Sequence, residues 1–290
     1  MDATLLLMQG LNGLQLGVML FLMAAGLTLV FGVMNLINLS HGSLYMMGAY
    51  LAASLQQQTG SFLWAILLAV PATLAVGMVV EVVTLRKLYD RDHLDQVLAT
   101  YGLILFFNEL VRMVWGPQAR FMALPEALSH SVVLFPGMRY PAYRLVIIGV
   151  GLGVGGLLFW LIHHTRLGML IRAGASNREM VNALGVNIKV LYTVVFGLGA
   201  ALAGLAGMMA GPILSIEVGM GEPVLILAFI VVVIGGIGSI KGAFVAAVLV
   251  GLVDTFGRVL LPAGVSSMSI CILMAGMLCW RPKGLFPAHG

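Results

Sequence analysis

Long runs of apolar residues recur along nearly the whole chain and restrict it to a membrane-embedded fold. Of its 290 residues, 61% are hydrophobic and 9% are charged, and the mean hydropathy is +1.07. A soluble domain carries about 25% charged residues, whereas a helix that spans a bilayer needs about 20 consecutive apolar ones. The apolar stretches run approximately over residues 11–33, 42–56, 62–85, 96–115, 143–163, 189–211, 223–238, 243–261 and 264–280.

These stretches predict an all-α, polytopic integral membrane protein with about 8–9 transmembrane helices. Little sequence remains between them, so residues 1–290 are expected to form a single transmembrane domain without a separate soluble part. The second stretch is short, and the glycine-rich run Gly235–Gly242 separates the seventh from the eighth. One helix is therefore expected to be broken or re-entrant, which leaves the number of crossings and the side of the N-terminus open.

Basic residues cluster in three segments that should share one side of the membrane. The loop after residue 85, the polar segment 165–189 and the tail after residue 280 hold Arg86, Lys87, Arg91, Arg166, Arg172, Arg178, Lys189, Arg281 and Lys283. Short cytoplasmic loops are enriched in Lys and Arg, so these segments are predicted to be cytoplasmic and the stretch 116–142 to lie outside. Arg258 conflicts with this arrangement if there are nine crossings.

The composition also argues against several classes. No basic stripe with interleaved aromatic residues is present, so we expect no nucleic-acid partner. No Lys or Arg precedes Arg86, so the first stretch lacks the basic region of a cleaved signal peptide and is expected to stay in the mature protein. Cys271 and Cys279 fall in the last stretch and are predicted to be small buried hydrophobes, neither a disulfide nor a metal pair.

Small residues recur at helical spacing in two stretches. One face of 189–211 carries Gly199, Ala203, Gly207 and Gly211, and 143–163 carries Gly149 and Gly153 with the offset pair Gly151 and Gly155. Such faces let helix backbones approach closely in lipid. Packing within this chain and packing against a second subunit are equally good explanations.

The polar segment 165–189 contains the signals of a short helix. Ser176 and Glu179 fit a capping box, in which the serine hydroxyl accepts from the Glu179 amide and the Glu179 carboxylate reaches back. Gly185 stands where helices commonly end in the left-handed conformation. A helix of two turns is marginal alone in water, so it should lie against something. It is either a docking element for another protein or an ordinary interhelical loop with a helical turn.

A second polar group interrupts the first two apolar stretches. It consists of Asn35, Asn38, Ser40 and His41. A broken helix that lines a polar cavity would have this pattern, and so would a short turn whose backbone is capped by Asn and Ser side chains.

Three acidic residues in the apolar stretches have a basic neighbour, which favours structural ion pairs. Glu81 precedes Arg86, Glu109 lies three residues before Arg112, and Asp254 lies four before Arg258. The run Gly235–Gly242 fits neither the dinucleotide fingerprint nor a phosphate-binding loop, and the six histidines are scattered. We therefore expect no catalytic residue, no metal site and no cofactor held by this chain, which predicts that it is not an enzyme.

Three segments together resemble one family. The run Val33–Tyr50, the segment from Arg172 to Val186 and the late stretch Val233–Ala243 resemble the LivH-type permease of branched-chain amino acid ABC importers, in the family's order and over nearly the entire chain. The resemblance implies a permease subunit in the bacterial inner membrane that moves its substrate by alternating access. Its implied partners are a second, LivM-type permease, two cytoplasmic ATPase subunits that bind ATP and Mg, and a periplasmic solute-binding protein.

The same resemblance implies roles for named residues. ATP-driven closure would reach the membrane helices through the coupling residues Arg172, Ala173, Asn177, Glu179, Leu184 and Gly185. The translocation path would be lined or shaped by Asn35, Asn38, Ser40 and His41. Relatives that move urea, short amides or aromatic acids leave the substrate open. The alternatives are a stand-alone, ion-coupled secondary transporter and an intramembrane enzyme that acts on lipid-linked substrates.

Overall fold

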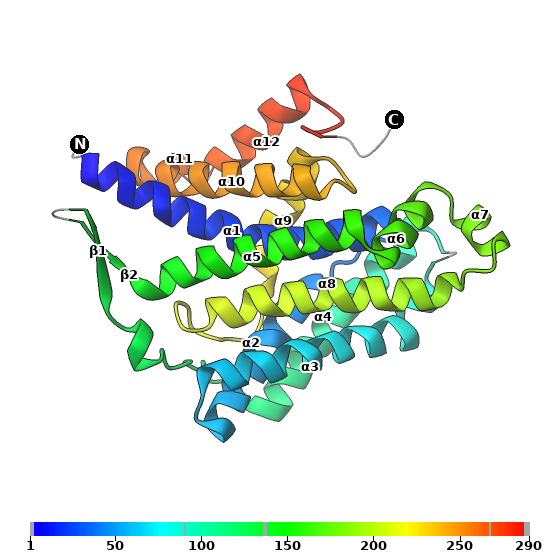
Figure 1. Cartoon of the computed structure of the whole chain (residues 1–290), viewed down its shortest axis with the longest axis horizontal. Helices are drawn as coiled ribbons and strands as arrows, with labels where there is room; N and C mark the ends of the chain where they lie inside the picture. Colours follow the sequence, from blue (N-terminus) through cyan, green and yellow to red (C-terminus); the bar gives the residue numbers. More distant parts are fainter. Residues whose placement is uncertain (1–2, 90, 136–137, 267, 287–290) are drawn as a thin grey trace.

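The computed structural model describes residues 3–89, 91–135, 138–266 and 268–286, and it is almost entirely helical (Figure 1). Each predicted apolar stretch contains a helix. These helices are α1 (Ala3–Met34), α2 (His41–Thr59), α3 (Phe62–Val83), α4 (His93–Trp115), α5 (Ala142–His164), α8 (Ile188–Ala210), α9 (Gly221–Gly235), α10 (Ile240–Leu260) and α12 (Ser269–Trp280). The connections hold the short helices η1 (Leu85–Lys87), η2 (Glu126–Leu128), α6 (Arg166–Ser176), α7 (Arg178–Ala183) and α11 (Ala263–Ser266).

Within the described residues, the one sheet is a small antiparallel hairpin in the stretch 116–142. Its strands β1 (Ser131–Phe135) and β2 (Met138–Pro141) pair Val132 with Tyr140, and the register shifts between Val133 and Phe135. The all-α prediction is confirmed apart from this hairpin, which lies at one end of the molecule outside the helix bundle (Figure 1).

Six helices among the described residues are long and apolar enough to cross a membrane. They are Thr4–Met34, Phe62–Lys87, His93–Trp115, Ala142–His164, Ile188–Ala210 and Ile240–Leu260. The remaining stretches form α2, which carries three consecutive glutamines near its end, and the shorter helices α9 and α12. The protein is thus a multi-pass membrane protein, while a count of eight or nine crossings stays a prediction. Gly235 ends α9, and Gly236 and Gly238 have φ values of 100° and 81° before α10 begins.

Glycine contacts hold the centre of the bundle together. A side chain on Gly207 of α8 would lie 2.0 Å from the Tyr45 carbonyl oxygen of α2, and one on Gly48 would lie 2.4 Å from Gly204. Gly199 packs on Gly26 of α1 in the same way. The small face predicted for 189–211 therefore packs within this chain. On α5, Gly151 and Gly155 pack on α1, whereas Gly149 and Gly153 face open space.

The three basic segments gather at one end of the bundle, as predicted. Figure 1 shows the end of α3 and the helices α6 and α7 at the same end, opposite the β1–β2 hairpin, with the described residues that follow α12 in the same half of the molecule. Backbone hydrogen bonds support this placement, because the Leu285 and Phe286 amides donate to the carbonyls of Ile234 and Gly235. We call this end the basic end. The positive-inside rule predicts that it faces the cytoplasm.

The predicted ion pairs form. The nitrogen–oxygen distances are 3.0 Å for Arg86–Glu81, 2.7 Å for Arg112–Glu109 and 2.9 Å for Arg258–Asp254. Pairing with Asp254 neutralises Arg258, which explains how this arginine is tolerated far from the basic end. The predicted burial of Cys271 and Cys279 is wrong: both are free and exposed. They lie on α12, which packs at the periphery and buries only Ile270 among its described residues.

Candidate functional site

Helix α6 folds back onto the end of α5 and carries the start of the coupling segment. The Thr165 hydroxyl caps α6 by accepting from the Gly168 amide at 3.1 Å. A side chain on Gly168 would lie 2.2 Å from the Ile162 carbonyl oxygen, so only glycine permits this tight turn. The buried residues of α6 are Gly168, Ile171 and Gly174. The guanidinium of Arg172 donates to the Ile162 carbonyl, so this predicted coupling residue secures α6 to α5.

The cap of α7 lies one residue later than predicted. Ser176 is the last residue of α6, and Asn177, with φ −153°, is the N-cap of α7. The side-chain oxygen of Asn177 accepts from the main-chain amide of Met180 at 2.9 Å, and the main-chain amide of Asn177 donates to the Ala173 carbonyl. The predicted capping box of Ser176 and Glu179 is therefore wrong. Asn and Ser are about equally good N-caps, and the continuation of α6 through Ser176 decides between them.

The end of α7 confirms the glycine signal. Gly185 has φ +86°. Its amide donates to the Asn182 carbonyl, and the Val186 amide donates to the Val181 carbonyl. This pair of bonds is the Schellman motif, which satisfies the last carbonyls of the helix. The short helix is thus closed by hydrogen bonds at both ends.

The outer surface of α7 is exposed and partly apolar. Leu184 is 76% exposed and Met180 58%, whereas Val181 points inward at 6%. Asn177, Glu179 and Gly185 are also exposed, and Ala173 is partly buried. The structure therefore brings the predicted coupling residues together on the two consecutive helices α6 and α7 at the basic end, with most of them accessible.

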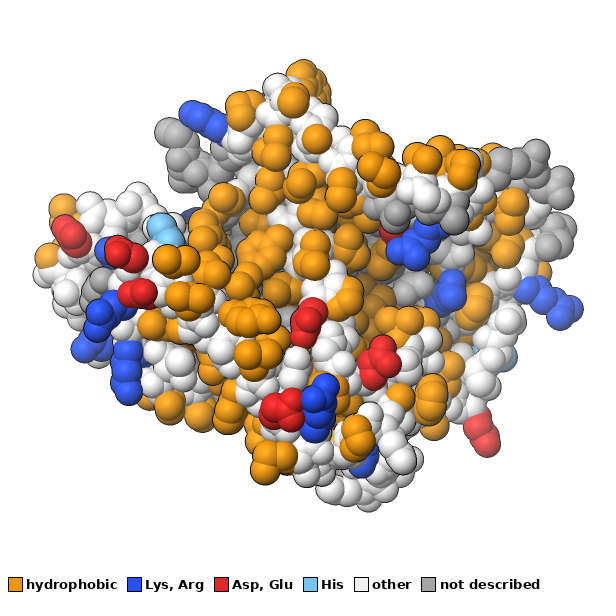
Figure 2. Space-filling view, turned by 180° about the vertical axis from the view of Figure 1, so that it is seen from behind, with side chains coloured by type: hydrophobic (Ala, Val, Ile, Leu, Met, Phe, Trp, Pro, Cys, Tyr) orange, Lys and Arg blue, Asp and Glu red, His pale blue; other side chains and the backbone are white. Residues whose placement is uncertain are grey.

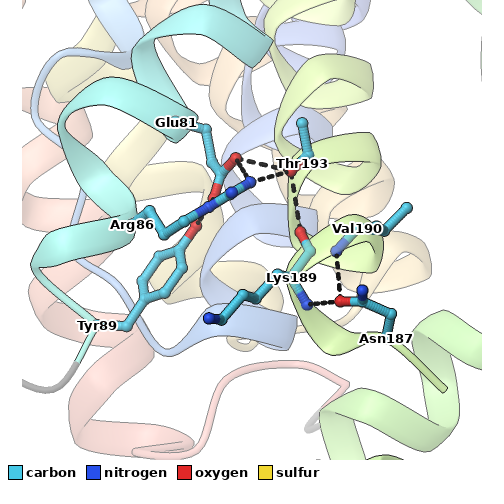
Figure 3. A network of polar contacts seen from close by, with 7 residues as sticks. All are labelled: Glu81, Arg86, Tyr89, Asn187, Lys189, Val190 and Thr193. Carbon is cyan, nitrogen blue, oxygen red and sulfur yellow. Dashed lines mark hydrogen bonds and ion pairs between the residues drawn. The ribbon is translucent and has the colours of Figure 1, made fainter. Parts of the chain in front are cut away.

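A buried carboxylate ties this element to the rest of the basic end (Figure 3). Glu81, at the end of α3, is fully buried and accepts hydrogen bonds from three residues. Two come from the Arg86 guanidinium at 3.2 and 3.0 Å, one from the Tyr89 hydroxyl at 2.5 Å and one from the Thr193 hydroxyl at 2.7 Å. We call these four side chains the Glu81 network.

Thr193 links the Glu81 network to the start of α8. Its hydroxyl lies 2.9 Å from the Lys189 carbonyl, one turn earlier, and accepts from Arg86 at 2.8 Å. Asn187 caps α8 by accepting from the amides of Lys189 and Val190 at 3.1 and 3.3 Å (Figure 3). Since α7 ends at Ala183, only a short link separates it from this anchored helix start.

Sequence reasoning predicted the Glu81–Arg86 pair but missed Tyr89 and Thr193. Burial raises the pKa of the Tyr89 hydroxyl, and its hydrogen bond to Glu81 adds to that rise, so the phenol stays protonated and donates. The sequence offered one hint of these further partners. A buried carboxylate can accept up to four hydrogen bonds, more than the two that Arg86 donates.

The predicted path residues occupy the break between α1 and α2. Asn35 is exposed and has φ 53°, which is rare outside glycine. Asn38, Ser40 and His41 are at most 1% exposed. The Asn38 oxygen accepts from the Ser40 amide at 3.0 Å and from its hydroxyl at 2.6 Å, which favours the capped-turn interpretation. His41 Nε2 lies 3.3 Å from the Met23 carbonyl, and its Nδ1 has no partner in the described part of the chain. Whether these residues act in transport stays a prediction.

Comparison with known proteins agrees with this geometry. Residues 10–279 match the family model described as branched-chain amino acid transport system / permease component. The chain is 30% identical to the high-affinity branched-chain amino acid transport system permease protein BraD of Pseudomonas aeruginosa, over 96% of this chain and 95% of that one. It is 27% identical to the permease protein LivH of Escherichia coli, over 96% and 94% of the two chains.

A more distant relative differs in its named substrate. The ribose import permease protein RbsC of Escherichia coli is 30% identical over 88% of this chain and 78% of that protein. No solved structure matches the chain. No three His, Cys, Asp or Glu side chains gather as a metal site in the residues that the structure describes. On its matched length and its helical membrane architecture, the chain belongs to the family of branched-chain amino acid transport permease components.

Proposed function

We propose that this chain is one permease subunit of an ATP-binding-cassette importer that moves branched-chain amino acids from the periplasm to the cytoplasm. Its place would be the bacterial inner membrane, with the basic end inside. The observation that carries the proposal is the closed, exposed helix α7 at the basic end, together with relatives named for branched-chain amino acid transport.

Under this proposal, α7 is the contact with a partner ATPase. Leu184 and Met180 present an apolar surface beside the carboxylate of Glu179. Closure of the ATPase pair would move α7 as one piece, because both of its ends are hydrogen-bonded. Arg172 would transmit that motion to α5, and the short link to Asn187 would transmit it to α8. The ATP and Mg would be bound by the ATPase subunits.

The buried residues Asn38, Ser40 and His41 would shape the path and not line it. They hold the first turn of α2 against α1, where a side chain on Gly26 would lie 2.9 Å from His41 Nε2. Alternating access then requires this turn to shift when α7 moves. A second permease of the LivM type and a periplasmic solute-binding protein would complete the assembly.

Uptake by the reconstituted complex tests the proposal. The chain is assembled in proteoliposomes with the companion permease, ATPases and binding protein from its genomic neighbourhood, and uptake of leucine, isoleucine and valine is measured. ATP-dependent uptake is expected. If the complex transported only ribose, urea, short amides or aromatic acids, the assignment of branched-chain amino acids as substrates would be wrong. Uptake by the chain alone, driven by an ion gradient, would show a secondary transporter.

A second experiment tests the contact. Glu179→Lys combined with Gly185→Val is expected to abolish substrate-stimulated ATP hydrolysis and uptake in the assembled complex. Glu126→Lys, a charge reversal on the exposed helix η2 away from the basic end, is the matched control and is expected to behave as the wild type. Full activity of the double variant would show that α7 is not the docking element.

A further inference from the structure

The exposed surfaces of α3 and α4 differ in a way that a uniform lipid environment does not explain. Both are candidate spans, and in each only 22% of the apolar window is buried. Every exposed residue of α3 is Leu, Trp, Pro, Ala or Val. Helix α4, in contrast, exposes Glu109 and Arg112, whose side chains are 63% and 53% accessible.

A second polar element lies against α4 at this point. Asn108, partly buried, donates from its side-chain amide to Glu222 Oε1 at 2.9 Å, across 114 residues of sequence. Glu222 is exposed in the first turn of α9 and makes no ion pair within the described residues. We call Asn108, Glu109, Arg112 and Glu222 the α4–α9 patch.

The α4–α9 patch begins at membrane depth and extends toward the end of α4. Asn108 follows the start of α4 by fifteen residues, about 22 Å along the helix axis, which lies within a hydrocarbon core about 30 Å thick, whereas Arg112 lies three residues before the helix end. Figure 2 shows acidic and basic side chains among mostly hydrophobic ones on one face of the molecule. Charged side chains in a transmembrane segment are expensive in lipid and normally face protein or water. The α4–α9 patch is therefore not a lipid-facing surface.

The α4–α9 patch also adjoins the break between α1 and α2. Gly221, the residue before Glu222, packs so closely on Gly42 that a side chain there would lie 1.9 Å from the Gly42 carbonyl oxygen. The first turns of α2 and α9 therefore meet backbone to backbone. This contact places Glu222 one residue from the first turn of α2, which directly follows Ser40.

The chemistry of the α4–α9 patch matches a free amino acid with an apolar side chain. Glu222 offers a carboxylate without a cation, and Asn108 holds one of its oxygens in place. Exposed apolar side chains lie about one helical turn from the polar groups on both helices: Ile226 is 63% exposed, Phe106 57% and Leu105 51%. An α-ammonium group needs an anionic acceptor, and a branched hydrocarbon side chain needs apolar contacts. The helix dipole of α9 also favours a carboxylate at this position, but it does not require the hydrogen bond from α4.

We propose that the α4–α9 patch lines the translocation path and that Glu222, oriented by Asn108, binds the α-ammonium group of the passing amino acid. This proposal rests on the proposed function. Arg112 is already neutralised by Glu109 and is assigned no contact with the substrate. Asn108 is a positioning residue for the Glu222 carboxylate.

Thiol labelling tests whether this face meets water. Cys271→Ala and Cys279→Ala first remove the exposed native thiols. Ile226→Cys, which keeps the Glu222 carboxylate, and, as the control on α3, Leu67→Cys are then treated in the reconstituted complex with a water-soluble trimethylammonium methanethiosulfonate. We expect labelling at position 226, slowed by leucine with the binding protein, and none at position 67. No labelling at 226, or labelling that leucine leaves unchanged, would overturn the proposal.

Transport by charge variants tests the role of Glu222. Glu222→Gln keeps an oxygen for Asn108 but removes the charge, and is expected to slow leucine uptake at least about tenfold, with partial recovery in Glu222→Asp. Glu126→Gln is expected to transport as the wild type. If the wild-type complex does not transport leucine, the proposed function fails. If it does and Glu222→Gln matches it, only the ammonium site fails. Should Glu222→Gln not assemble, labelling of Asn108→Cys decides by the same criteria.

Discussion

The carboxylate of Glu81 and the hydroxyl of Thr193 lie 2.7 Å apart, although 112 residues separate them in the sequence. This contact joins the end of α3 to the first turns of α8, directly after the exposed helix α7. A charge buried at the edge of a membrane bundle is stable only when its hydrogen-bonding capacity is used, and here Arg86, Tyr89 and Thr193 use it. The Glu81 network therefore fixes the base from which α7 projects.

Glu81→Gln should loosen that base. The change removes the charge from hydrogen bonds that are each worth about 1.5–3 kcal/mol when one partner is ionised. We expect a lower midpoint of thermal unfolding for the purified chain and weaker coupling of ATP hydrolysis to uptake. Thr193→Val should lower coupling in the same direction by a smaller amount, whereas Glu126→Gln should change neither. An unchanged unfolding midpoint in Glu81→Gln would contradict the anchoring role.

Asn177→Ala should fray α7, and Ser176→Ala should not. Removal of an N-cap costs about 1 kcal/mol, which corresponds to roughly fivefold faster exchange through local opening. Hydrogen exchange of the amides from Met180 to Gly185, measured by mass spectrometry on the two variants, checks this. Equal exchange in the two variants, or faster exchange in Ser176→Ala, would contradict the assignment of Asn177 as the N-cap.

Position 185 should tolerate asparagine but not valine. The backbone there has φ +86°, and a Cβ atom at this position would have no neighbour within 4 Å. Which residues fit at position 185 is therefore set by the backbone conformation and not by the available space. Asparagine enters the left-handed region with little strain, whereas a β-branched residue does not. We expect Gly185→Asn to keep uptake in the assembled complex and Gly185→Val to lose most of it. Similar uptake by the two variants would show that transport does not require a left-handed backbone conformation at position 185.

Gly207→Leu should prevent folding, and Gly153→Leu should not. A leucine side chain at position 207 would clash with the Tyr45 carbonyl oxygen of α2, whereas one at position 153 would point into open space. The yield of monodisperse protein in size-exclusion chromatography compares the two. A normal yield of Gly207→Leu would mean that α2 and α8 do not pack as closely as the structure has them.

Local signals were sufficient for much of this fold. The apolar stretches located the long helices, the left-handed end at Gly185 followed from one glycine, and the ion pair of Glu109 with Arg112 followed from helical spacing. The cap failed because Ser176 and Asn177 are neighbours of similar capping strength, and the choice depends on how far α6 extends. Helix α6 itself was not predicted, since its buried face consists of two glycines and one isoleucine and gives little periodicity.

Contacts between distant segments were not predictable from spacing. Thr193 and Tyr89 reach Glu81 only because α8 and the loop after η1 meet at the basic end. The hydrogen bond from Asn108 to Glu222 likewise depends on α9 starting beside α4. The burial of Cys271 and Cys279 was misjudged because an apolar stretch does not reveal which of its faces turns away from the bundle.

Neither residue at the joint between Gly42 and Gly221 carries a side chain. The closest approach there is main chain against main chain, and the side chains of Leu225 and Met46 complete the contact between the two helix starts. A single added methyl group at either position would act as a wedge between the helix starts. Under the proposed function, alanine there is expected to hold the two helix starts apart and to favour one stage of the transport cycle, which gives structural work a way to arrest a conformation without any bound inhibitor.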